Sequence, residues 1–404
     1  MKIKKIVIIS HHFWPENFLI NEIALKFKKL NRKVTIITGL PNYPVGKIFK
    51  KYNKIKSVKN EKFRGINIIR FPIIPRNKGN FIDLILNYLS YLVNGFYHIR
   101  KLNLKHTFDH IFIYSTSPIT TALLGIYLKK KYKKKITLWV QDLWPESVKS
   151  TGFIKNSLLL YLISLIVKFI YKNSDNIIAQ SNAFKKNINR YSNKKINVVE
   201  NSHFNIQNKK IKIPKKINKL LNNKFCITFA GNIGKAQSIK TVLKTCGMIK
   251  NYKNIKIILI GGGSEVQTAR DYIKKFKLDN ISIFGPYPSN LAFNILTKSK
   301  ACLLTLKKNN IFSLTIPNKF QTYLYAKKPI LVSANGEVAK LTRKNNVGFT
   351  SPAENSKKLK DNIVKLYKLN TKQINKIKKN CNLYYRNSFD LNKQTRKLLS
   401  IMDK

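Results

Sequence analysis

The sequence has few acidic residues. Its 404 residues include 17 Asp and Glu against 78 Lys and Arg, which gives a formal net charge of +61. Of the basic residues, 68 are Lys and only 10 are Arg, and Asn occurs 46 times. Proteins that read nucleic acid favour Arg for its bidentate fork, whereas here Lys is spread along the whole chain. The composition therefore indicates a general drift toward Lys and Asn and no dedicated nucleic-acid role. It favours attraction to an anionic membrane surface.

Cysteine and glycine are also scarce. The four cysteines, Cys226, Cys246, Cys302 and Cys381, have no C-x-x-C spacing, so neither a metal site nor a disulfide framework is expected. We therefore expect a cytoplasmic protein. The first apolar stretch, residues 6–9, is too short for a signal peptide and is predicted to be a strand. With 16 Gly and 13 Pro, the chain is neither collagen-like nor a Pro/Gly polymer.

Long apolar runs are absent as well. The longest, residues 153–171, is interrupted by polar residues, and its most apolar part covers only residues 158–167. About 20 residues are needed to span a bilayer. Residues 82–99 carry apolar side chains at helical spacing. Both segments are predicted to be helices that either face a core or dip into a membrane interface, and the pattern leaves the two possibilities open.

Short apolar runs alternate with helical patterns along most of the chain. The predicted strands are residues 5–10, 33–38, 66–71, 110–115, 136–140, 176–179, 196–199, 225–230, 255–260, 281–284, 301–306 and 329–333. Continuous apolar strands separated by helices indicate buried parallel sheets. The Lys- and Asn-rich residues 205–224 are predicted to be a linker. We therefore predict an α/β protein with two doubly wound domains, residues 1–204 and 225–384, followed by a C-terminal helix over residues 385–404.

In open parallel sheets, ligands bind beyond the carboxyl ends of the strands. In the first half, the chemistry-bearing residues at such places are His11, His12, Glu16, Asn17, Asp142, Trp144 and Glu146. Carboxylates there stand out in so basic a chain, although Glu265, which opens a helix, can equally serve as a cap. For Asp142 we favour a functional role, because a Gln-Asp pair between two Trp is an unusual choice for a cap. One of the two histidines can equally be a packing residue.

Three glycine or amide loops follow strands or open helices in the second half. They are residues 231–235 (Gly-Asn-Ile-Gly-Lys), residues 261–263 (Gly-Gly-Gly) and the pair Asn318-Lys319. Glycine lets the backbone approach a ligand, and the next helix offers free N–H groups. Neither a Walker loop nor a G-x-G-x-x-G fingerprint is present. Residues 261–263 alone can be only a tight turn, but together the three loops predict a site for a pyrophosphate.

Six stretches that follow one another along the chain carry a resemblance to a known family. They are HHFWPEN (11–17), LPNYPVG (40–46), VQDLWPES (140–147), GNIGKAQ (231–237), GGGSE (261–265) and TIPNKFQTYLYAKKPI (315–330). With them the chain resembles the retaining glycosyltransferases of family four, and more closely the L-fucosamine-transferase-like enzymes of bacterial O-antigen and capsule clusters. The resemblance implies the GT-B fold, with two Rossmann-like domains, the active site in their cleft and the C-terminal helix crossing back to the first domain. It also implies retention of configuration and no metal ion or other cofactor.

The resemblance implies a role for each matching residue. The second domain would hold a nucleotide-sugar, expected to be a UDP-sugar, through Gly231, Asn232, Gly234, Lys235, Gly261, Gly262, Gly263, Glu265, Phe284, Pro286, Asn318, Lys319 and Gln321. The first domain would hold the acceptor. His11, Glu16 and Asp142 are the expected catalytic residues, and His12, Asn17, Trp144 and Glu146 the expected acceptor contacts.

Two departures from the family pattern bear on the donor site. The two glutamates usual in the broad family are replaced by Ser313 and Gln321, and the usual arginine after the first glycine is Asn232. Lys235 and Lys319 are then the expected cations for the leaving group. We interpret these changes as specificity, while a catalytically inactive relative with the same fold stays possible.

The expected function is transfer of a sugar, an N-acetylated deoxyhexosamine, from a UDP-sugar to a polyprenyl-linked saccharide in surface polysaccharide synthesis. The protein would then be cytoplasmic and peripheral on the inner face of the cell membrane. One alternative is a UDP-sugar epimerase of the same fold. Another is a non-enzymatic basic protein that binds membrane or nucleic acid, against which the ordered motifs at strand ends argue.

Overall fold

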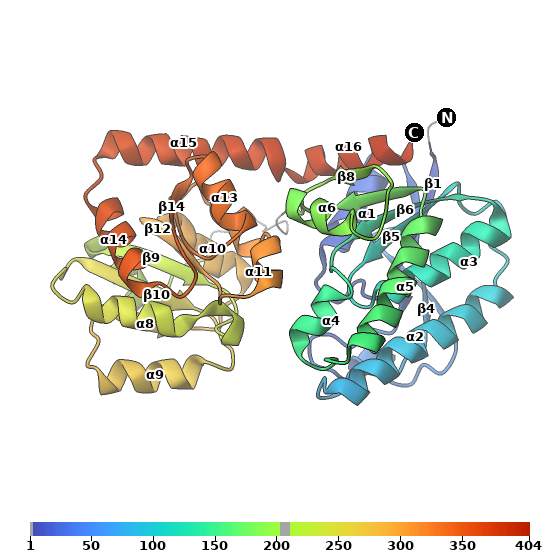
Figure 1. Ribbon diagram of the computed structural model, residues 1–404, viewed down its shortest axis with the longest axis horizontal. Coiled ribbons are helices and arrows are strands. Elements are labelled where there is room, and N and C mark those ends of the chain that lie inside the picture. Colours follow the sequence, from blue (N-terminus) through green and yellow to red (C-terminus); the bar gives the residue numbers. More distant parts are fainter. Residues whose placement is uncertain (1–2, 203–210) are drawn as a thin grey trace. The chain divides into compact units, whose positions relative to one another are not determined.

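The computed structural model describes residues 3–202 and 211–404. The chain divides into two compact units, Met1–Asn201 with Leu391–Lys404, and Ser202–Asp390. Figure 1 traces the chain through them in sequence colours. Each unit is built around one largely parallel sheet, as the alternation of apolar runs and helical patterns predicts.

The sheet of the first unit has the strand order β3-β4-β2-β1-β5-β6-β7-β8. In chain order the strands are β1 (Lys5–Ser10), β2 (Lys33–Gly39), β3 (Lys59–Phe63), β4 (Ile66–Phe71), β5 (His110–Ser115), β6 (Lys135–Val140), β7 (Asn176–Ala179) and β8 (Ile196–Val198). All neighbours pair in parallel except β3 with β4. The strand order reverses between β1 and β5, and in such sheets a crevice opens there at the carboxyl ends.

Helices flank this sheet. They are α1 (Leu19–Lys29), α2 (Phe81–Lys101), α3 (Ala122–Tyr132), α4 (Glu146–Thr151), α5 (Ser157–Asn173), α6 (Asn182–Ile188) and α16 (Leu391–Met402), with short 3-10 turns η1 (Lys50–Tyr52) and η2 (Ile119–Thr121). Helix α3 contacts β5, β6, α2 and α5, and α16 packs on α1. The end of the chain is held by Asp403, which accepts from the Ile3 N–H at 2.9 Å and pairs with Arg32 at 3.2 Å.

The sheet of the second unit has the order β11-β10-β9-β12-β13-β14, with parallel pairing throughout. Its strands are β9 (Phe225–Ala230), β10 (Ile255–Ile260), β11 (Ile281–Phe284), β12 (Ala301–Thr305), β13 (Ile330–Ser333) and β14 (Gly348–Ser351). The order reverses between β9 and β12. The glycine loops that follow β9 and β10 therefore lie beside this second switch point.

The helices of the second unit complete the alternation. They are α7 (Lys215–Asn223), α8 (Ile239–Met248), α9 (Val266–Lys275), α10 (Ser289–Lys298), α11 (Asn310–Leu314), α12 (Asn318–Tyr325), α13 (Glu337–Lys344), α14 (Ser356–Tyr367) and α15 (Thr371–Ser388), with a 3-10 turn η3 (Lys235–Gln237). Apolar side chains of α8, α9 and α14 share one buried cluster with the sheet. A second cluster joins α12 and α15 to the strands.

The prediction of a linker over residues 205–224 is wrong for its second part. Residues 215–223 form α7, whose Ile217 and Leu221 are buried against Cys226 and Ile258. The many Lys and Asn side chains of this segment lie on its outer face, so composition concealed a helix that the apolar spacing supports. Residues 205–210 of the predicted linker lie outside the described residues.

Two edge strands were not predicted from the sequence. Strand β3 has the polar sequence KNEKF, and β14 has GFTS, because an edge strand needs no continuous apolar run. In the described part of the chain, no helix is both long enough and apolar enough to cross a membrane.

Candidate functional site

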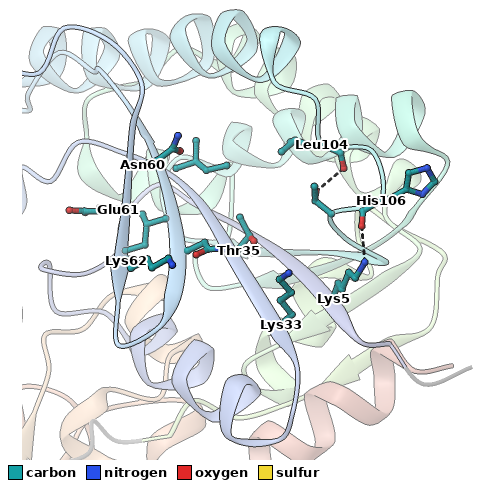
Figure 2. Close-up of a pocket in the computed structure, with 12 residues that line it drawn as sticks. Lys5, Lys33, Thr35, Asn60, Glu61, Lys62, Leu104 and His106 are labelled. Carbon is teal, nitrogen blue, oxygen red and sulfur yellow. Dashed lines mark hydrogen bonds between the residues drawn. The ribbon is translucent and has the colours of Figure 1, made fainter.

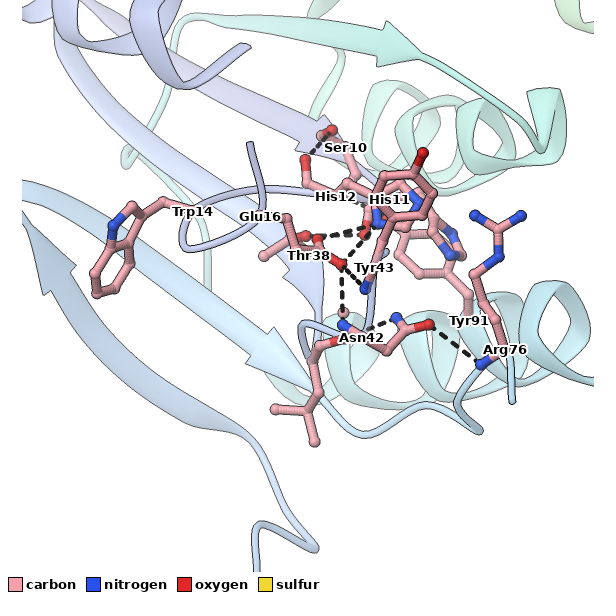
Figure 3. A network of polar contacts seen from close by, with 12 residues as sticks. Ser10, His11, His12, Trp14, Glu16, Thr38, Asn42, Tyr43, Arg76 and Tyr91 are labelled. Atoms are coloured by element: carbon pink, nitrogen blue, oxygen red, sulfur yellow. Dashed lines mark hydrogen bonds and ion pairs between the residues drawn. The ribbon is translucent and has the colours of Figure 1, made fainter. Parts of the chain in front are cut away.

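A polar cluster lies beyond the carboxyl end of β1 in the first unit. It consists of His11, His12, Glu16, Asn42 and Tyr43, and we call it the strand-end cluster. Figure 3 shows these side chains gathered together, while the nearby Trp14 points away from them. Trp14 instead stacks on the ring of Phe63, with a centroid distance of 4.5 Å. The structure thus brings together three predicted residues, His11, His12 and Glu16.

Glu16 is the centre of this cluster. Its carboxylate lies 3.0 Å from Nδ1 of His12 through both oxygens. Its Oε1 also accepts the backbone N–H groups of Asn42, at 2.9 Å, and Tyr43, at 2.8 Å. The side chains of His12 and Glu16 are only 3% and 2% exposed. Because the carboxylate accepts from Nδ1–H, the lone pair of the neutral His12 ring lies on Nε2, which suits it to accept a proton from a hydroxyl group.

His11 is held in the opposite tautomer. Its Nε2 lies 3.0 Å from Oδ1 of Asn87, whose amide nitrogen donates to the carbonyl of Ile74. Nε2 therefore carries the proton, and Nδ1 is a buried acceptor with no partner among the described residues. Burial lowers the pKa of His11 well below its usual value, and the charges of His12 and Arg76 act in the same direction. His11 is neutral near pH 7 and offers an acceptor to a ligand's hydroxyl.

Arg76 supplies a cation beside the strand-end cluster. Its guanidinium carbon lies 5.5 Å from the centre of the Tyr43 ring, and its backbone N–H donates to Oδ1 of Asn42 at 3.2 Å. None of the ion pairs among the described residues involves Arg76. Burial raises the pKa of Tyr88, and the charge of Arg76 opposes that rise. The sequence analysis missed Arg76, although it is one of only 10 arginines and follows β4 by five residues.

Asp142 follows β6, and its position is fixed by the loop after β5. Its Oδ2 accepts the backbone N–H of Ser117 at 2.8 Å. The hydroxyl of the same serine accepts from the indole Nε1 of Trp144 at 3.1 Å. The negative charge of Asp142 contributes to the raised pKa of Tyr88, after burial. Asp142 and Trp144 thus lie near the strand-end cluster, with Tyr88 between.

Two predicted acceptor contacts have other surroundings. Oε1 of Glu146 accepts from Nδ2 of Asn187 at 3.0 Å and from the hydroxyl of Tyr191 at 2.8 Å, so this carboxylate anchors the end of α6. Asn17 is exposed and lies before the first turn of α1, where Phe18 is the N-cap residue. Neither side chain belongs to the strand-end cluster.

In the second unit, three glycines allow a close approach of the loops after β9 and β10. A β-carbon on Gly261 would lie 1.9 Å from the carbonyl oxygen of Gly231. One on Gly263 would lie 2.4 Å from Oδ1 of Asn232, and one on Gly231 would lie 2.6 Å from Cε of Lys319. All three glycines have positive φ angles, between 136° and 152°. Only glycine fits these positions, and the loops form a bare backbone surface at the switch point.

Lys319 lies across these loops from the start of α12. Its Nζ donates to Oε1 of Gln237 at 3.1 Å and lies 5.1 Å from the centre of the Phe229 ring. No ion pair of the described residues includes it. Burial lowers the pKa of this amine to about 8. A half-buried cation whose neighbours are an amide and an aromatic ring has the chemistry to bind an anion. Gln237 was not predicted as a site residue.

The other predicted donor residues surround this surface or support it. Exposed or partly exposed on it are Asn232, Lys235, Gly262, Glu265, Phe284, Pro286 and Asn318. Gly234 is buried under the amide of Asn232. Gln321 is 1% exposed, and in its satisfied orientation its amide donates to the carbonyls of Pro317 and Asn318. Gln321 therefore stabilises the start of α12 from below. The hydroxyl of Ser313 donates to the carbonyl of Asn310 within α11.

A separate pocket lies away from the strand-end cluster. A pocket of about 480 Å³ opens at the amino ends of β1 and β2, where Lys5, Lys33, Lys62, Glu61 and His106 line it (Figure 2). It lies at the end of the strands opposite to the strand-end cluster. The described residues contain no group of three or more His, Cys, Asp or Glu side chains placed to hold a metal ion.

One comparison with known proteins falls within the second unit. Residues 210–383 match the family model of glycosyl transferases group 1. This match covers less than half of the chain, and we call the matched residues the group 1 domain. The glycine loops and Lys319 lie inside the group 1 domain, whereas the strand-end cluster and Arg76 lie outside it.

Alignments with individual proteins extend over more of the chain than residues 210–383. "Probable glycosyltransferase WbjE" of Pseudomonas aeruginosa is 22% identical over 286 residues, 69% of this chain and 70% of that protein. A glycosyltransferase structure from Rickettsia africae ESF-5 is similar with a TM-score of 0.69 and 19% identity, covering 99% of this chain and 98% of that one. The structure of Alr3699/HepE from Anabaena in complex with UDP has a TM-score of 0.70 and 14% identity, with 98% of both chains covered. The predicted GT-B fold, with two Rossmann-like domains, is confirmed.

Proposed function

We propose that this protein is a retaining, metal-independent glycosyltransferase that takes a sugar from a UDP-sugar. The observation that carries the proposal is Lys319, a half-buried cation that forms no ion pair in the described part of the chain and lies across the glycine loops of the group 1 domain. An anionic diphosphate would relieve the cost of burying this charge. Structures of HepE with UDP and with UDP-glucose support a uridine nucleotide as the donor.

In this proposal the second unit stabilises the leaving group. The bond between the sugar C1 and the diphosphate oxygen breaks, and negative charge grows on that oxygen. Lys319, Lys235 and the N–H groups of the glycine loops would stabilise this charge without a proton transfer. No step in this scheme requires a protein nucleophile.

The first unit would position the acceptor. Its hydroxyl oxygen forms the new bond to C1 on the face that the diphosphate leaves, and the leaving phosphate takes the hydroxyl proton. Nδ1 of His11, which has no partner among the described residues, and Nε2 of His12 are the ring acceptors that would orient this hydroxyl. Asp142 would stabilise positive charge on the sugar. Retention follows from attack on the same face.

The finer identity of the substrates rests on the resemblance of the sequence motifs. It supports an N-acetylated deoxyhexosamine as the transferred sugar and a polyprenyl-linked saccharide as the acceptor, in the synthesis of O-antigen or capsule. The protein would act at the inner face of the cell membrane.

The donor part is tested by a thermal-shift panel with UDP, GDP, ADP and their sugar conjugates. Saturation at 100 times the dissociation constant adds about 2.7 kcal/mol to the free energy of unfolding, so we expect a clear rise of the unfolding temperature with uridine nucleotides. No rise with any nucleotide would contradict the proposal. An epimerase of this fold would instead convert the UDP-sugar to its epimer without releasing UDP, which sugar analysis detects.

The surface of α2 and α5 supports attachment to a membrane. Large apolar side chains are exposed along both helices and in the segment before α5: Phe81, Ile82, Ile85, Leu86, Leu89, Val93, Tyr97, Phe153, Leu158, Leu159, Tyr161, Leu162, Leu165, Ile166 and Phe169. We call this the α2–α5 face. Exposed Lys155, Lys168 and Lys172 accompany it, and Asp83 is the one acidic residue in these two helices. A continuous apolar surface with basic side chains suits an anionic bilayer.

We expect the wild-type protein to float with vesicles that contain anionic phosphatidylglycerol. Replacing Leu89 and Leu162 together with Ser should reduce the vesicle-bound fraction at least about tenfold, because each side chain gains roughly 1.5–3 kcal/mol on leaving water. Leu383→Ser is the matched control, since Leu383 is 48% exposed on α15, which belongs to the second unit. Equal flotation of the double variant, or equal loss in the control, would contradict membrane binding through the α2–α5 face.

A further inference from the structure

A second, smaller pocket of about 140 Å³ lies in the first unit, between the start of α2 and the segment after β6. Its lining is almost wholly apolar or aromatic and consists of Phe81, Leu84, Ile85, Tyr88, Ser117, Trp144, Ser147, Val148, Phe153 and Ile154. All of these residues belong to one unit. Such a lining suits a hydrocarbon chain.

The inner end of this pocket adjoins the strand-end cluster. Tyr88 lines the pocket, and its ring centre lies 5.9 Å from that of His11 and 6.4 Å from that of Trp144. Ser117 lines it too, and its N–H is held by Asp142. Tyr88 therefore forms a wall common to the pocket and the strand-end cluster, and a ligand that fills the pocket lies beside this cluster.

The outer end of the pocket opens onto the α2–α5 face. Phe81 and Phe153 line the pocket, with ring centres 5.9 Å apart, and they are 37% and 45% exposed. Ile85 belongs to both the pocket and the face. Phe81, Ile85 and Phe153 therefore connect the exposed apolar face to the pocket.

Arg76 supplies a cation near the inner end of the pocket. The guanidinium of Arg76 lies against the Tyr43 ring and has no ion pair among the described residues. Its charge acts on both His11 and Tyr88. Arginine is the side chain best suited to a phosphate group. His11 adds a buried ring acceptor with no partner in the described part of the chain.

We propose that the first unit binds its acceptor as an anionic amphiphile, with a hydrocarbon chain in this pocket and a phosphate at Arg76. This deepens the proposed function and rests on it. The ligand class is an isoprenoid or other long chain that carries a phosphate or diphosphate. The pocket holds the carbons next to the phosphate, and the rest of the chain lies along the α2–α5 face. A saccharide on the phosphate then reaches His11 and His12.

The test measures binding of radiolabelled geranylgeranyl phosphate to the full-length protein in non-ionic micelles. Ser147→Leu reduces the volume of the pocket, and Arg76→Met removes the cation. We expect each to weaken binding at least about tenfold, the scale of one charged hydrogen bond or a few buried methylenes. The control for Ser147→Leu is Ser150→Leu, which is on the same helix, α4. The control for Arg76→Met is Arg100→Met, near the end of α2. Ser150 and Arg100 are both exposed. These should bind within about twofold of wild type.

Further binding measurements distinguish an isoprenoid phosphate from other lipids that carry a hydrocarbon chain. Geranylgeraniol, which lacks the phosphate, should bind the wild type more weakly, and Arg76→Met should not change its affinity. Competition by phosphatidylglycerol as strong as by unlabelled geranylgeranyl phosphate would assign the pocket to bulk lipid and overturn the proposal. Wild-type affinity in both Ser147→Leu and Arg76→Met would overturn it as well.

The uridine nucleotides distinguish this inference from the function on which it rests. Ser147→Leu and Arg76→Met should keep the rise in unfolding temperature with UDP, because both residues lie outside the group 1 domain. A UDP response in the wild type without binding of the lipid phosphate refutes only the acceptor site. Absence of the UDP response in the wild type refutes the proposed function itself.

Discussion

Replacing Lys319 with Met should lower the rate of sugar transfer about 10²–10³-fold, the usual effect of removing one group that stabilises transition-state charge. Methionine keeps the length of the side chain and loses only the charge and the hydrogen bond to Gln237. The measurement is kcat/KM for release of UDP from the donor. Lys274→Met is the control, because Lys274 is an exposed lysine on α9. A variant that keeps full turnover would show that the leaving group is stabilised elsewhere.

The same substitution, Lys319→Met, should not lower the stability of the free protein. Burial lowers the pKa of Lys319 from 10.5 to about 8, which corresponds to roughly 3 kcal/mol against the charged form in the folded protein. Lys319→Met removes this cost, so the unfolding temperature of the free protein should not fall. The rise in that temperature with UDP should nevertheless shrink. A variant that unfolds at a much lower temperature without ligand would indicate a structural role for the amine.

The pH dependence follows from the same pKa. Between about pH 8 and the unfolded value near 10.4, the unfolded chain binds the proton more tightly, so this group makes the folded protein more stable as pH rises. Activity depends on the charged amine in the free enzyme, so kcat/KM should fall as pH rises through about 8. A bound diphosphate favours the charged form, so kcat should fall only at higher pH. In Lys319→Met this difference between the two profiles should disappear.

The proposed donor site was more predictable from the sequence than the proposed acceptor site, for a physical reason. Glycines at strand ends mark places where no side chain fits, and Gly231, Gly261 and Gly263 meet one another because neighbouring parallel strands end at the same edge. Lys319 was expected beside them. The hydrogen bond from Lys319 to Gln237 depends on the conformations of two long side chains, which the spacing of residues in the sequence does not predict.

The acceptor side depends on contacts between distant segments. Trp-Pro-Glu occurs twice, at residues 14–16 and 144–146, and both Glu16 and Glu146 were predicted to be site residues. Glu146 is the first residue of α4 and reaches α6, whereas Glu16 precedes α1 and meets the loop after β2. Tyr88 on α2 and Arg76 in the segment before α2 were missed because they lie near His11 in the fold but more than 60 residues from it in the chain. Helix α7 was missed because exposed Lys and Asn conceal its apolar spacing, and the edge strands were missed because they have no continuous apolar run.

Glu16→Gln should slow sugar transfer by roughly 10²-fold, the scale on which a misplaced reacting group lowers the rate. The carboxylate of Glu16 accepts from Nδ1–H of His12 and fixes the tautomer of that ring. An amide can present its own N–H to Nδ1 and so place the ring proton on Nε2, which would then no longer accept from a hydroxyl group. Gln can still accept the N–H groups of Asn42 and Tyr43, so the loop should keep its position.

Two measurements distinguish the loss of this orientation from a general structural defect, because donor binding is proposed for the other unit. We expect Glu16→Gln to keep the UDP-induced rise in unfolding temperature and the slow hydrolysis of the donor by water, while transfer to the acceptor falls. Glu22→Gln, a half-buried position on α1, should leave both reactions unchanged. If Glu16→Gln slows hydrolysis and transfer equally, the carboxylate acts on the sugar or its leaving group, and His12 is not the residue that orients the acceptor. If only transfer falls, the strand-end cluster acts on the acceptor hydroxyl, because that group is the one reactant absent from the hydrolysis reaction.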